Sequence, residues 1–199
     1  MNKLLKTEKW IGVYRKLLEG SEEQEFDSAK TSRPQIADLH RFLSKKNMIK
    51  PGTLMLDWGG GKYDRSKDFI EGSTEDVTFL TYDPFNRTEE HNNSVISRIK
   101  SNGGADVITI ANVFNVIKEK SVREDTIRQI KENLKPDGKF YVSVYNAPRT
   151  DKYEETEEFV GQPTSDGWQN AQPIKFYLPE VQKYFPDAFV KYNIISAQK

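Results

Sequence analysis

Short apolar runs alternate with more polar segments along the chain. Residues 53–57, 77–82 and 106–112 are apolar runs of strand length, and residues 139–145 alternate between two kinds of side chain. Continuous apolar runs are typical of strands buried on both faces of a parallel sheet, and strict alternation is typical of a strand with two different faces. We therefore expect four core strands. Residues 174–178 and 189–196 are expected to add two more strands.

The segments outside these runs have helical spacing. Residues 1–20 carry apolar positions at near-helical intervals, which predicts an amphipathic helix that packs on the fold or serves as a lid or partner-binding helix. A second helix is expected to begin at Ser32, a capping residue, and to present Ile36, Leu39 and Leu43 on its apolar face. Further helices are expected at residues 64–70, 89–100, 113–134 and 179–185.

Strands separated by helices, with two more strands at the end, predict an α/β fold. We expect a mostly parallel sheet with an antiparallel C-terminal strand at its edge. The connection between Asp83 and Asp106 is long enough for one helix only, so the third-strand region is expected to be shortened. We interpret residues 1–199 as a single domain, with N-terminal helices in residues 1–50, a ligand-binding core in 51–146, and an acidic polar loop and C-terminal strands in 147–199.

Composition narrows the classes of function. The 199 residues include 30 basic and 30 acidic side chains, which gives no strong signal for nucleic-acid binding through bulk charge. There is no cysteine, so disulfides, zinc–thiolate sites and thiol nucleophiles are excluded. With only His40 and His91, a histidine-rich metal site is not expected, and no catalytic base is recognisable. No apolar run has the roughly 20 residues of a membrane span, and the first residues lead into charges rather than a signal-peptide core, so we expect a cytoplasmic protein.

The most informative stretch follows the first predicted strand. Asp57 and Trp58 precede three consecutive glycines, 59–61, so the loop backbone can approach a ligand closely. The second predicted strand ends in Asp83. A glycine loop after one strand and a carboxylate at the tip of the next is how α/β sheets hold the ribose of a nucleoside.

The residues around the glycines restrict the nucleoside. The dinucleotide fingerprint needs a third glycine where Asp64 stands, and a carboxylate there would oppose a pyrophosphate. No Gly-Lys-Ser or Gly-Lys-Thr follows, so a P-loop is absent. A ligand with a ribose, no phosphate and a positive charge fits better, since it tolerates nearby carboxylates. S-adenosylmethionine has these properties.

These motifs together resemble the class I S-adenosylmethionine-dependent methyltransferases. The resemblance rests on the loop at 56–61, on Tyr82-Asp83-Pro84, on the strand at 106–112, and on Leu134-Lys135-Pro136-Asp137-Gly138 before the strand that follows it. It covers roughly residues 31–146. A narrower resemblance is to the methyltransferase-like proteins associated with DNA phosphorothioation systems and phages.

The resemblance implies a Rossmann-like fold and a cofactor site. Asp57 and the glycines would line the methionine end, Asp83 would accept hydrogen bonds from the ribose hydroxyls, and residues 84–85 would flank the adenine. The implied cofactor-binding residues are Asp57, Trp58, Gly59, Gly60, Gly61, Tyr63, Asp64, Asp83, Pro84, Phe85, Asn112 and Val113. No metal is implied. The chain lacks the Asp/Asn-Pro-Pro-Tyr motif of amino-methylating nucleic-acid enzymes and any thiolate for cytosine C5 chemistry, which disfavours the familiar DNA substrates.

Several interpretations stay open at this stage. The chain is expected to be a methyltransferase with an unidentified acceptor, or a non-catalytic protein that senses S-adenosylmethionine through a partner. An NAD-dependent oxidoreductase is a third, weaker alternative. Asn115 fits a helix start as well as a ligand role, Trp168 is expected to pack rather than stack on substrate, and His40 and Tyr145 are candidates for an acceptor pocket. The sequence does not determine the oligomeric state.

Overall fold

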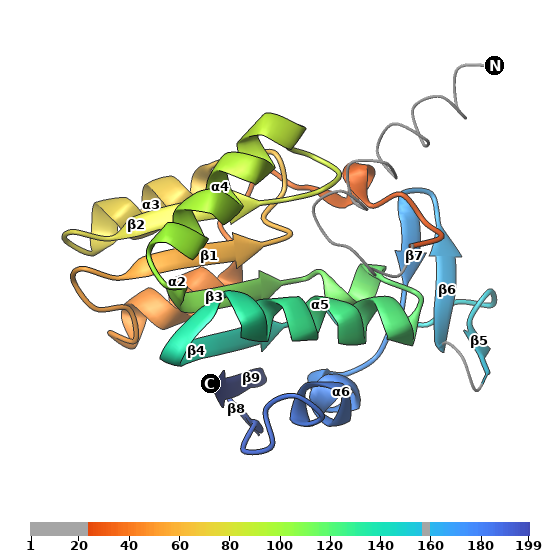
Figure 1. The fold of residues 1–199 in the computed structure, drawn as a ribbon. Helices are drawn as coiled ribbons and strands as arrows, with labels where there is room; N and C mark the ends of the chain where they lie inside the picture. The colour runs from red at the N-terminus through yellow and green to blue at the C-terminus, as the bar shows by residue number, and fades with distance from the viewer. Residues whose placement is uncertain (1–23, 157–159) are drawn as a thin grey trace.

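The computed structural model describes residues 24–156 and 160–199, so the helix expected in residues 1–20 lies outside the described part. A central sheet with the order β2-β1-β3-β4-β9-β8 runs through the described residues (Figure 1). Its strands are Leu54–Trp58 (β1), Thr78–Tyr82 (β2), Ala105–Ala111 (β3), Leu134–Ser143 (β4), Phe189–Lys191 (β8) and Ile194–Gln198 (β9). The four predicted core strands are therefore confirmed. Strand β4 begins at Leu134 and not at Lys139 as predicted, because Leu134 already pairs with Ala105, and the pairing shifts register before Lys139 pairs with Val107.

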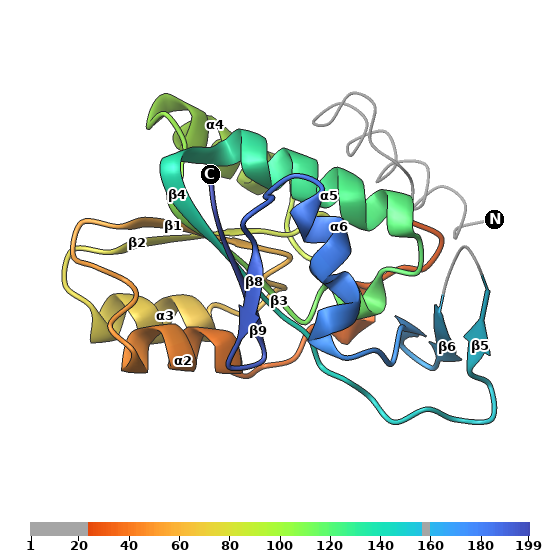
Figure 2. The same ribbon diagram turned by 90° about the horizontal axis from the view of Figure 1, so that it is seen from below.

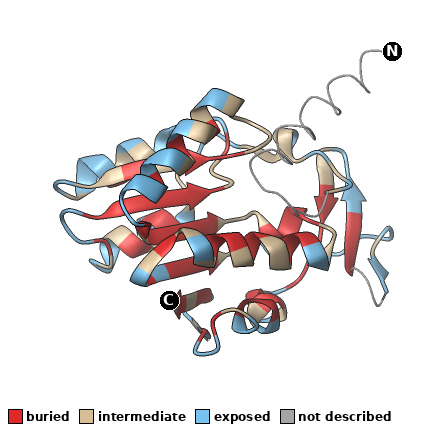
Figure 3. Ribbon diagram, in the orientation of Figure 1, coloured by how far each residue is buried: buried red, intermediate tan, exposed pale blue. Residues whose placement is uncertain are grey.

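Helices cover both faces of this sheet, as the view from below shows (Figure 2). The helices Glu89–Ser101 (α4) and Lys120–Asn133 (α5) lie on one face, together with Leu178–Gln182 (α6). The helices Asp38–Lys45 (α2) and Arg65–Ser73 (α3) lie on the other. Successive strand residues point to opposite faces, so Leu56 belongs to the core under α4 and α5 while Met55 belongs to the core over α2 and α3. Strands β1 and β3 are accordingly buried along most of their length (Figure 3).

The strand order tests two predictions, the shortened third-strand region and the antiparallel C-terminal strand. Strand β2 is at the edge of the sheet and is followed by α4 alone, which confirms the shortened third-strand region. Strands β1, β2, β3 and β4 are parallel, whereas β9 pairs antiparallel with both β4 and β8. The antiparallel strand is thus confirmed, but it lies inside the sheet and not at its edge, because β8 pairs along its outer side.

Two predictions for the C-terminal segment are wrong. Residues 174–178, expected as a strand, begin a 3₁₀ turn, Ile174–Tyr177 (η3), that continues into α6. Ile174 and Tyr177 are both buried in the core beside α5. Residues three apart lie on the same side of a 3₁₀ turn but on opposite faces of a strand, so the turn lets both reach this core. The single strand expected at 189–196 is a hairpin, β8 and β9, whose turn residues Tyr192 and Asn193 both have positive φ, at 55° and 59°. That combination is typical of a type I′ turn.

Other boundaries also differ from the prediction. Helix α2 begins at Asp38 with Ala37 before it, so Ser32 does not cap it. The long helix expected over residues 113–134 is a short 3₁₀ turn, Phe114–Val116 (η2), followed by α5. The segment 146–173 is not a plain loop, since it contains the three-stranded sheet β5-β6-β7. Its strands are Glu154–Glu155 (β5), Val160–Thr164 (β6) and Gly167–Gln169 (β7), and a further 3₁₀ turn, Ala29–Thr31 (η1), precedes α2.

Candidate functional site

A cleft of about 1030 Å³ opens at the carboxyl ends of the parallel strands. The small sheet β5-β6-β7 lies beyond this edge (Figure 1). Carboxyl ends of parallel strands are where open α/β sheets place their ligands. Of the residues predicted as a cofactor site, these line the cleft: Asp57, Trp58, Gly59, Gly60, Gly61, Tyr63, Asp83, Pro84, Phe85, Asn112 and Val113. Asp64 does not line it.

The glycine loop is held by hydrogen bonds to its own neighbours. The N–H groups of Gly59 and Gly60 both donate to the carbonyl of Tyr82, at 2.7 and 3.3 Å. The next two N–H groups donate to side chains, Gly61 to Asp83 at 2.7 Å and Lys62 to Ser32 Oγ at 3.1 Å. Four consecutive N–H groups are thus bonded within the protein, whereas a pyrophosphate-binding loop points such groups at its ligand.

Two of the glycines are required by close approach. A Cβ added to Gly59 would lie 2.5 Å from Val113 Cγ2, because the loop after β1 touches the loop after β3. A Cβ added to Gly60 would lie 2.7 Å from both Asp57 Oδ2 and Thr81 Cγ2. The glycines therefore let the backbone pack tightly against the ends of β2 and β3, which leaves the cleft open above them.

Asp83 is buried at the tip of β2, and it also faces the cleft. Its Oδ1 accepts hydrogen bonds from the N–H groups of Phe85 and Asn86 and from Asn86 Nδ2. Within residues 24–156 and 160–199, its Oδ2 accepts a hydrogen bond only from the N–H of Gly61. A carboxylate has about four acceptor positions, so Oδ2 keeps room for a further donor such as a hydroxyl. Burial raises the pKa of Asp83, and the N–H groups of Phe85, Gly61 and Asn86 partly oppose this rise.

Asp64 does not behave as predicted. Its carboxylate pairs with Arg87 Nη2 at 2.6 Å, and Arg87 Nε donates to the carbonyl of Gly61 at 2.8 Å. Arg87 thus neutralises Asp64 and fastens the glycine loop to the start of α3. Asp64 is therefore paired with a cation outside the cleft lining, and its charge no longer argues against a pyrophosphate. The internal bonding of the loop N–H groups replaces that argument.

Asp57 is fixed from the α2 side of the sheet. Thr109 Oγ1 donates to Asp57 Oδ1 at 2.8 Å, and His40 Nε2 lies 3.0 Å from the same hydroxyl oxygen. Since the threonine hydroxyl uses its one hydrogen on Asp57, His40 Nε2 must be the donor to Thr109. His40 is fully buried and does not line the cleft, so it positions Asp57 instead of facing an acceptor.

The far wall of the cleft is built by residues whose grouping the sequence does not reveal. Asn115, Tyr145, Trp168 and Gln169 all line it, and Asn115 belongs to η2 instead of starting a helix. Asn170 joins β7 to η2, since its N–H donates to the Asn115 carbonyl at 2.7 Å and its Nδ2 donates to the carbonyls of residues 114 and 117. The Trp168 ring is buried and packs 5.4 Å from Phe26, as the packing prediction requires.

Residues 24–156 and 160–199 contain no group of three or more His, Asp or Glu placed to hold a metal ion. No helix in those ranges has the length and apolar character needed to cross a membrane. The titratable groups among the described residues that line the cleft are carboxylates, tyrosines and one arginine, Arg33.

No family model and no curated protein matches the sequence, but solved structures match the fold. The 1,6-didemethyltoxoflavin-N1-methyltransferase of Burkholderia thailandensis, solved with 1,6-didemethyltoxoflavin and S-adenosylhomocysteine, matches with a TM-score of 0.53 at 12% identity, over 87% of this chain and 79% of that one. PigF, solved with SAH, matches with a TM-score of 0.51 at 13% identity, over 97% of this chain and 69% of that one. A candidate O-methyltransferase of Nostoc punctiforme matches with a TM-score of 0.52 at 14% identity, over 97% of this chain and 67% of that one.

The chain has the Rossmann-like fold of class I methyltransferases. The antiparallel strand β9 between β4 and β8 agrees with this fold, whereas the dinucleotide-binding sheet is parallel throughout its order. At identities of 12–14% these matches establish the architecture. The ligand has to be argued from the residues of this chain.

Proposed function

We propose that this chain is an S-adenosylmethionine-dependent methyltransferase. The observation that carries the proposal is the combination, in one cleft, of a glycine loop whose N–H groups are bonded internally and two buried carboxylates, Asp57 and Asp83. The N–H groups of this loop are therefore not free to bind a phosphate, and the two carboxylates would oppose one. The cleft suits a nucleoside that carries a positive charge, and the proteins matched above with S-adenosylhomocysteine share the fold of this chain.

The residues present fit the proposed cofactor. The free acceptor position of Asp83 Oδ2 suits a ribose hydroxyl, and Pro84 and Phe85 next to it offer apolar surface for adenine. Asp57, held by Thr109, offers a carboxylate to the positively charged methionine end. A cleft of about 1030 Å³ is at the upper end of the usual range for small-molecule sites, so it has room for a cofactor and a small acceptor together.

Bound S-adenosylmethionine would supply a methyl group on a sulfonium, which is already activated for displacement. The protein's part in such a reaction is to hold the acceptor in line with the methyl group and to keep water out. A base is needed only when the acceptor atom carries a proton at neutral pH. This explains why no catalytic base is recognisable in the sequence.

Calorimetric titration with S-adenosylmethionine, S-adenosylhomocysteine and NAD tests the cofactor. We expect both adenosyl ligands to bind and NAD to fail, whereas binding of NAD alone would contradict the proposal. Incubation with methyl-labelled donor and a metabolite extract then tests transfer. Label in a product supports the enzyme; binding without transfer to any acceptor would favour a cofactor-sensing protein.

Two finer expectations belong to this proposal. We propose that the protein acts in the cytoplasm and that its methyl acceptor is still to be identified. Its 30 basic and 30 acidic residues cancel, so the composition gives no strong signal for a nucleic-acid partner. The narrower resemblance to proteins associated with DNA phosphorothioation systems and phages remains a prediction from sequence motifs alone. None of the matching structures named above carries that association.

A further inference from the structure

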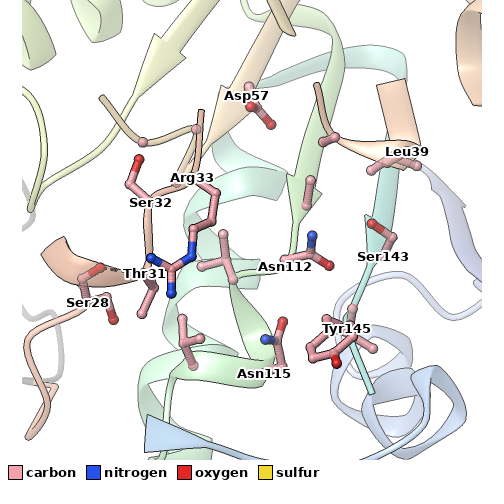
Figure 4. Close-up of a pocket in the computed structure, with 18 of the residues that line it drawn as sticks. Ser28, Thr31, Ser32, Arg33, Leu39, Asp57, Asn112, Asn115, Ser143 and Tyr145 are labelled. Atoms are coloured by element: carbon pink, nitrogen blue, oxygen red, sulfur yellow. Dashed lines mark hydrogen bonds between the residues drawn. The ribbon is translucent and has the colours of Figure 1, made fainter. Parts of the chain in front are cut away.

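The cleft has a second end, away from Asp57, which we call the distal half. It is lined by Ser28, Thr31, Asn115, Tyr145, Trp168 and Gln169. Figure 4 shows Ser28, Thr31, Asn115 and Tyr145 at the end opposite Asp57, with Asn112 between the two ends. The distal half thus presents hydroxyls, side-chain amides and the exposed ring of Tyr145, whereas the ring of Trp168 is packed against Phe26.

Charge is nearly absent from the distal half. Among the cleft-lining residues that the structure describes, the charged ones near this end are Arg33 and Asp166, and they pair with each other at 2.6 Å. An ionic acceptor would therefore find no free counter-charge here. Aromatic rings and uncharged hydrogen-bonding groups suit a neutral, planar molecule.

A chain of side-chain amides fixes the polarity of this wall. Gln169 Nε2 donates to the carbonyl of Tyr145 at 3.3 Å, and Asn115 Nδ2 donates to Gln169 Oε1 at 3.3 Å. The carbonyl of Tyr145 can only accept, so Gln169 must turn its amide NH₂ toward it and its oxygen toward Asn115. Asn115 must then present its own NH₂ to Gln169, which leaves Asn115 Oδ1 directed elsewhere.

Asn115 Oδ1 is buried and has no hydrogen-bond partner among the residues that the structure describes. The side chain is at the cleft wall, and the residue is only 3% exposed. A buried acceptor without a donor costs roughly 1–3 kcal/mol, so a ligand that brings a donor to this atom recovers that cost. A ligand without one leaves the atom unpaired.

We propose that Asn115 Oδ1 is the specificity point of the methyl-acceptor site, and that it selects a neutral, planar molecule bearing an N–H or O–H donor. This proposal rests on the proposed methyltransferase function, because the ligand of the distal half is a methyl acceptor only in a methyltransferase. The amide relay from Tyr145 through Gln169 makes Asn115 an obligatory hydrogen-bond acceptor. The distal half therefore discriminates between donor-bearing and donor-free ligands of the same shape.

Indole and benzofuran are matched probes for this discrimination, because they share shape and differ in one N–H group. Both are titrated into the protein saturated with S-adenosylhomocysteine, with binding followed by ligand-observed NMR. Loss of a hydrogen bond to a built site is strongly penalised, so we expect indole to bind about tenfold or more tightly than benzofuran.

Three variants assign the effect to the relay. Asn115→Leu, similar in shape, should abolish the preference for indole and leave S-adenosylhomocysteine binding unchanged. Gln169→Leu frees the Asn115 amide to rotate and should reduce the preference. The control Asn133→Leu removes an amide on α5 that bonds to the Gln129 carbonyl outside the cleft, and it should preserve the preference.

The outcomes separate this proposal from the proposed function. Equal binding of the two probes to the wild-type protein, no binding of indole, or an unchanged preference in Asn115→Leu would each overturn the assignment of Asn115. A loss of S-adenosylhomocysteine binding in Asn115→Leu would also overturn it, by placing Asn115 in the cofactor site. Failure of the wild-type protein to bind S-adenosylhomocysteine at all would instead count against the methyltransferase function.

Discussion

The carboxylate of Asp83 accepts a hydrogen bond of 2.7 Å from the backbone N–H of Gly61. This contact joins the tip of β2 to the loop after β1, and it uses only one of the acceptor positions on Oδ2. The same side chain therefore shapes the glycine loop and keeps an acceptor directed at the cleft.

Asp83→Ala should weaken the binding of S-adenosylhomocysteine by roughly ten- to a hundredfold, since it removes a charged acceptor worth about 1.5–3 kcal/mol per hydrogen bond. Isothermal calorimetry measures the change. Asp187→Ala, which removes an exposed carboxylate outside the cleft, is the matched control and should bind normally. Undiminished binding in Asp83→Ala would remove Asp83 from the cofactor site.

The affinity for S-adenosylhomocysteine should fall on acidification. Burial raises the pKa of Asp83 above its ordinary 3.8. Ribose hydroxyls donate to the ionised carboxylate, so bound ligand favours the charged form, and affinity should drop as the pH falls through the raised pKa and stay constant above it. The free energy of unfolding of the unliganded protein should depend on pH in the opposite direction. The raised pKa of Asp83 contributes stability below the unfolded-state pKa, and this contribution is lost as the pH rises through the folded-state pKa. Calorimetry across the acidic range, with Asp83→Asn as the reference, tests the ligand profile.

Arg87→Met should loosen the glycine loop and lower cofactor affinity several-fold, because Arg87 joins the Gly61 carbonyl to Asp64. Asp64→Asn should have a small effect. Its side chain is 51% exposed, and exposed ion pairs contribute about 0–1 kcal/mol. Titration of both variants with S-adenosylhomocysteine checks the order. A larger loss in Asp64→Asn than in Arg87→Met would show that the Asp64 charge itself serves the ligand.

Gly60→Ala should destabilise the fold by about 1–3 kcal/mol, since the added methyl group would lie 2.7 Å from Asp57 Oδ2 and from Thr81 Cγ2. Gly72→Ala offers the opposite case. Gly72 is in α3 and has no atom within 4 Å of an added Cβ, so alanine should stabilise the helix by about 0.5–1 kcal/mol. Urea denaturation compares the two. Equal effects would mean that packing around the glycine loop does not restrict residue 60.

The buried ion pair between Arg123 on α5 and Glu180 on α6 gives a stability prediction. Its two hydrogen bonds are 2.7 and 2.9 Å long, and both side chains are almost fully buried. Glu180→Leu leaves the Arg123 charge unpaired and should cost about 3–5 kcal/mol. The double change Arg123→Met with Glu180→Leu should cost less than the single one. Thermal and urea unfolding of the wild-type protein and the two variants measure these costs. A double variant less stable than Glu180→Leu alone would contradict the prediction.

The sequence by itself determined the core strands, their mostly parallel arrangement, and the placement of the glycine loop and Asp83 at the same edge of the sheet. Residues 107–111 are mostly apolar, and such a run is typical of a strand buried on both faces of a parallel sheet. Because parallel strands end at one edge, Asp57 and Asp83 had to lie near each other.

Only the tertiary structure decided which groups remain free for a ligand. The pairing of Asp64 with Arg87, the bond from Thr109 to Asp57, and the relay from Tyr145 through Gln169 to Asn115 all join residues far apart in the chain. Residues 174–177 likewise form a helical turn, which places both Ile174 and Tyr177 in the same core. Local periodicity fixes how a segment can fold, whereas hydrogen-bond partners are chosen by contacts between distant segments, and no pattern along the chain encodes them.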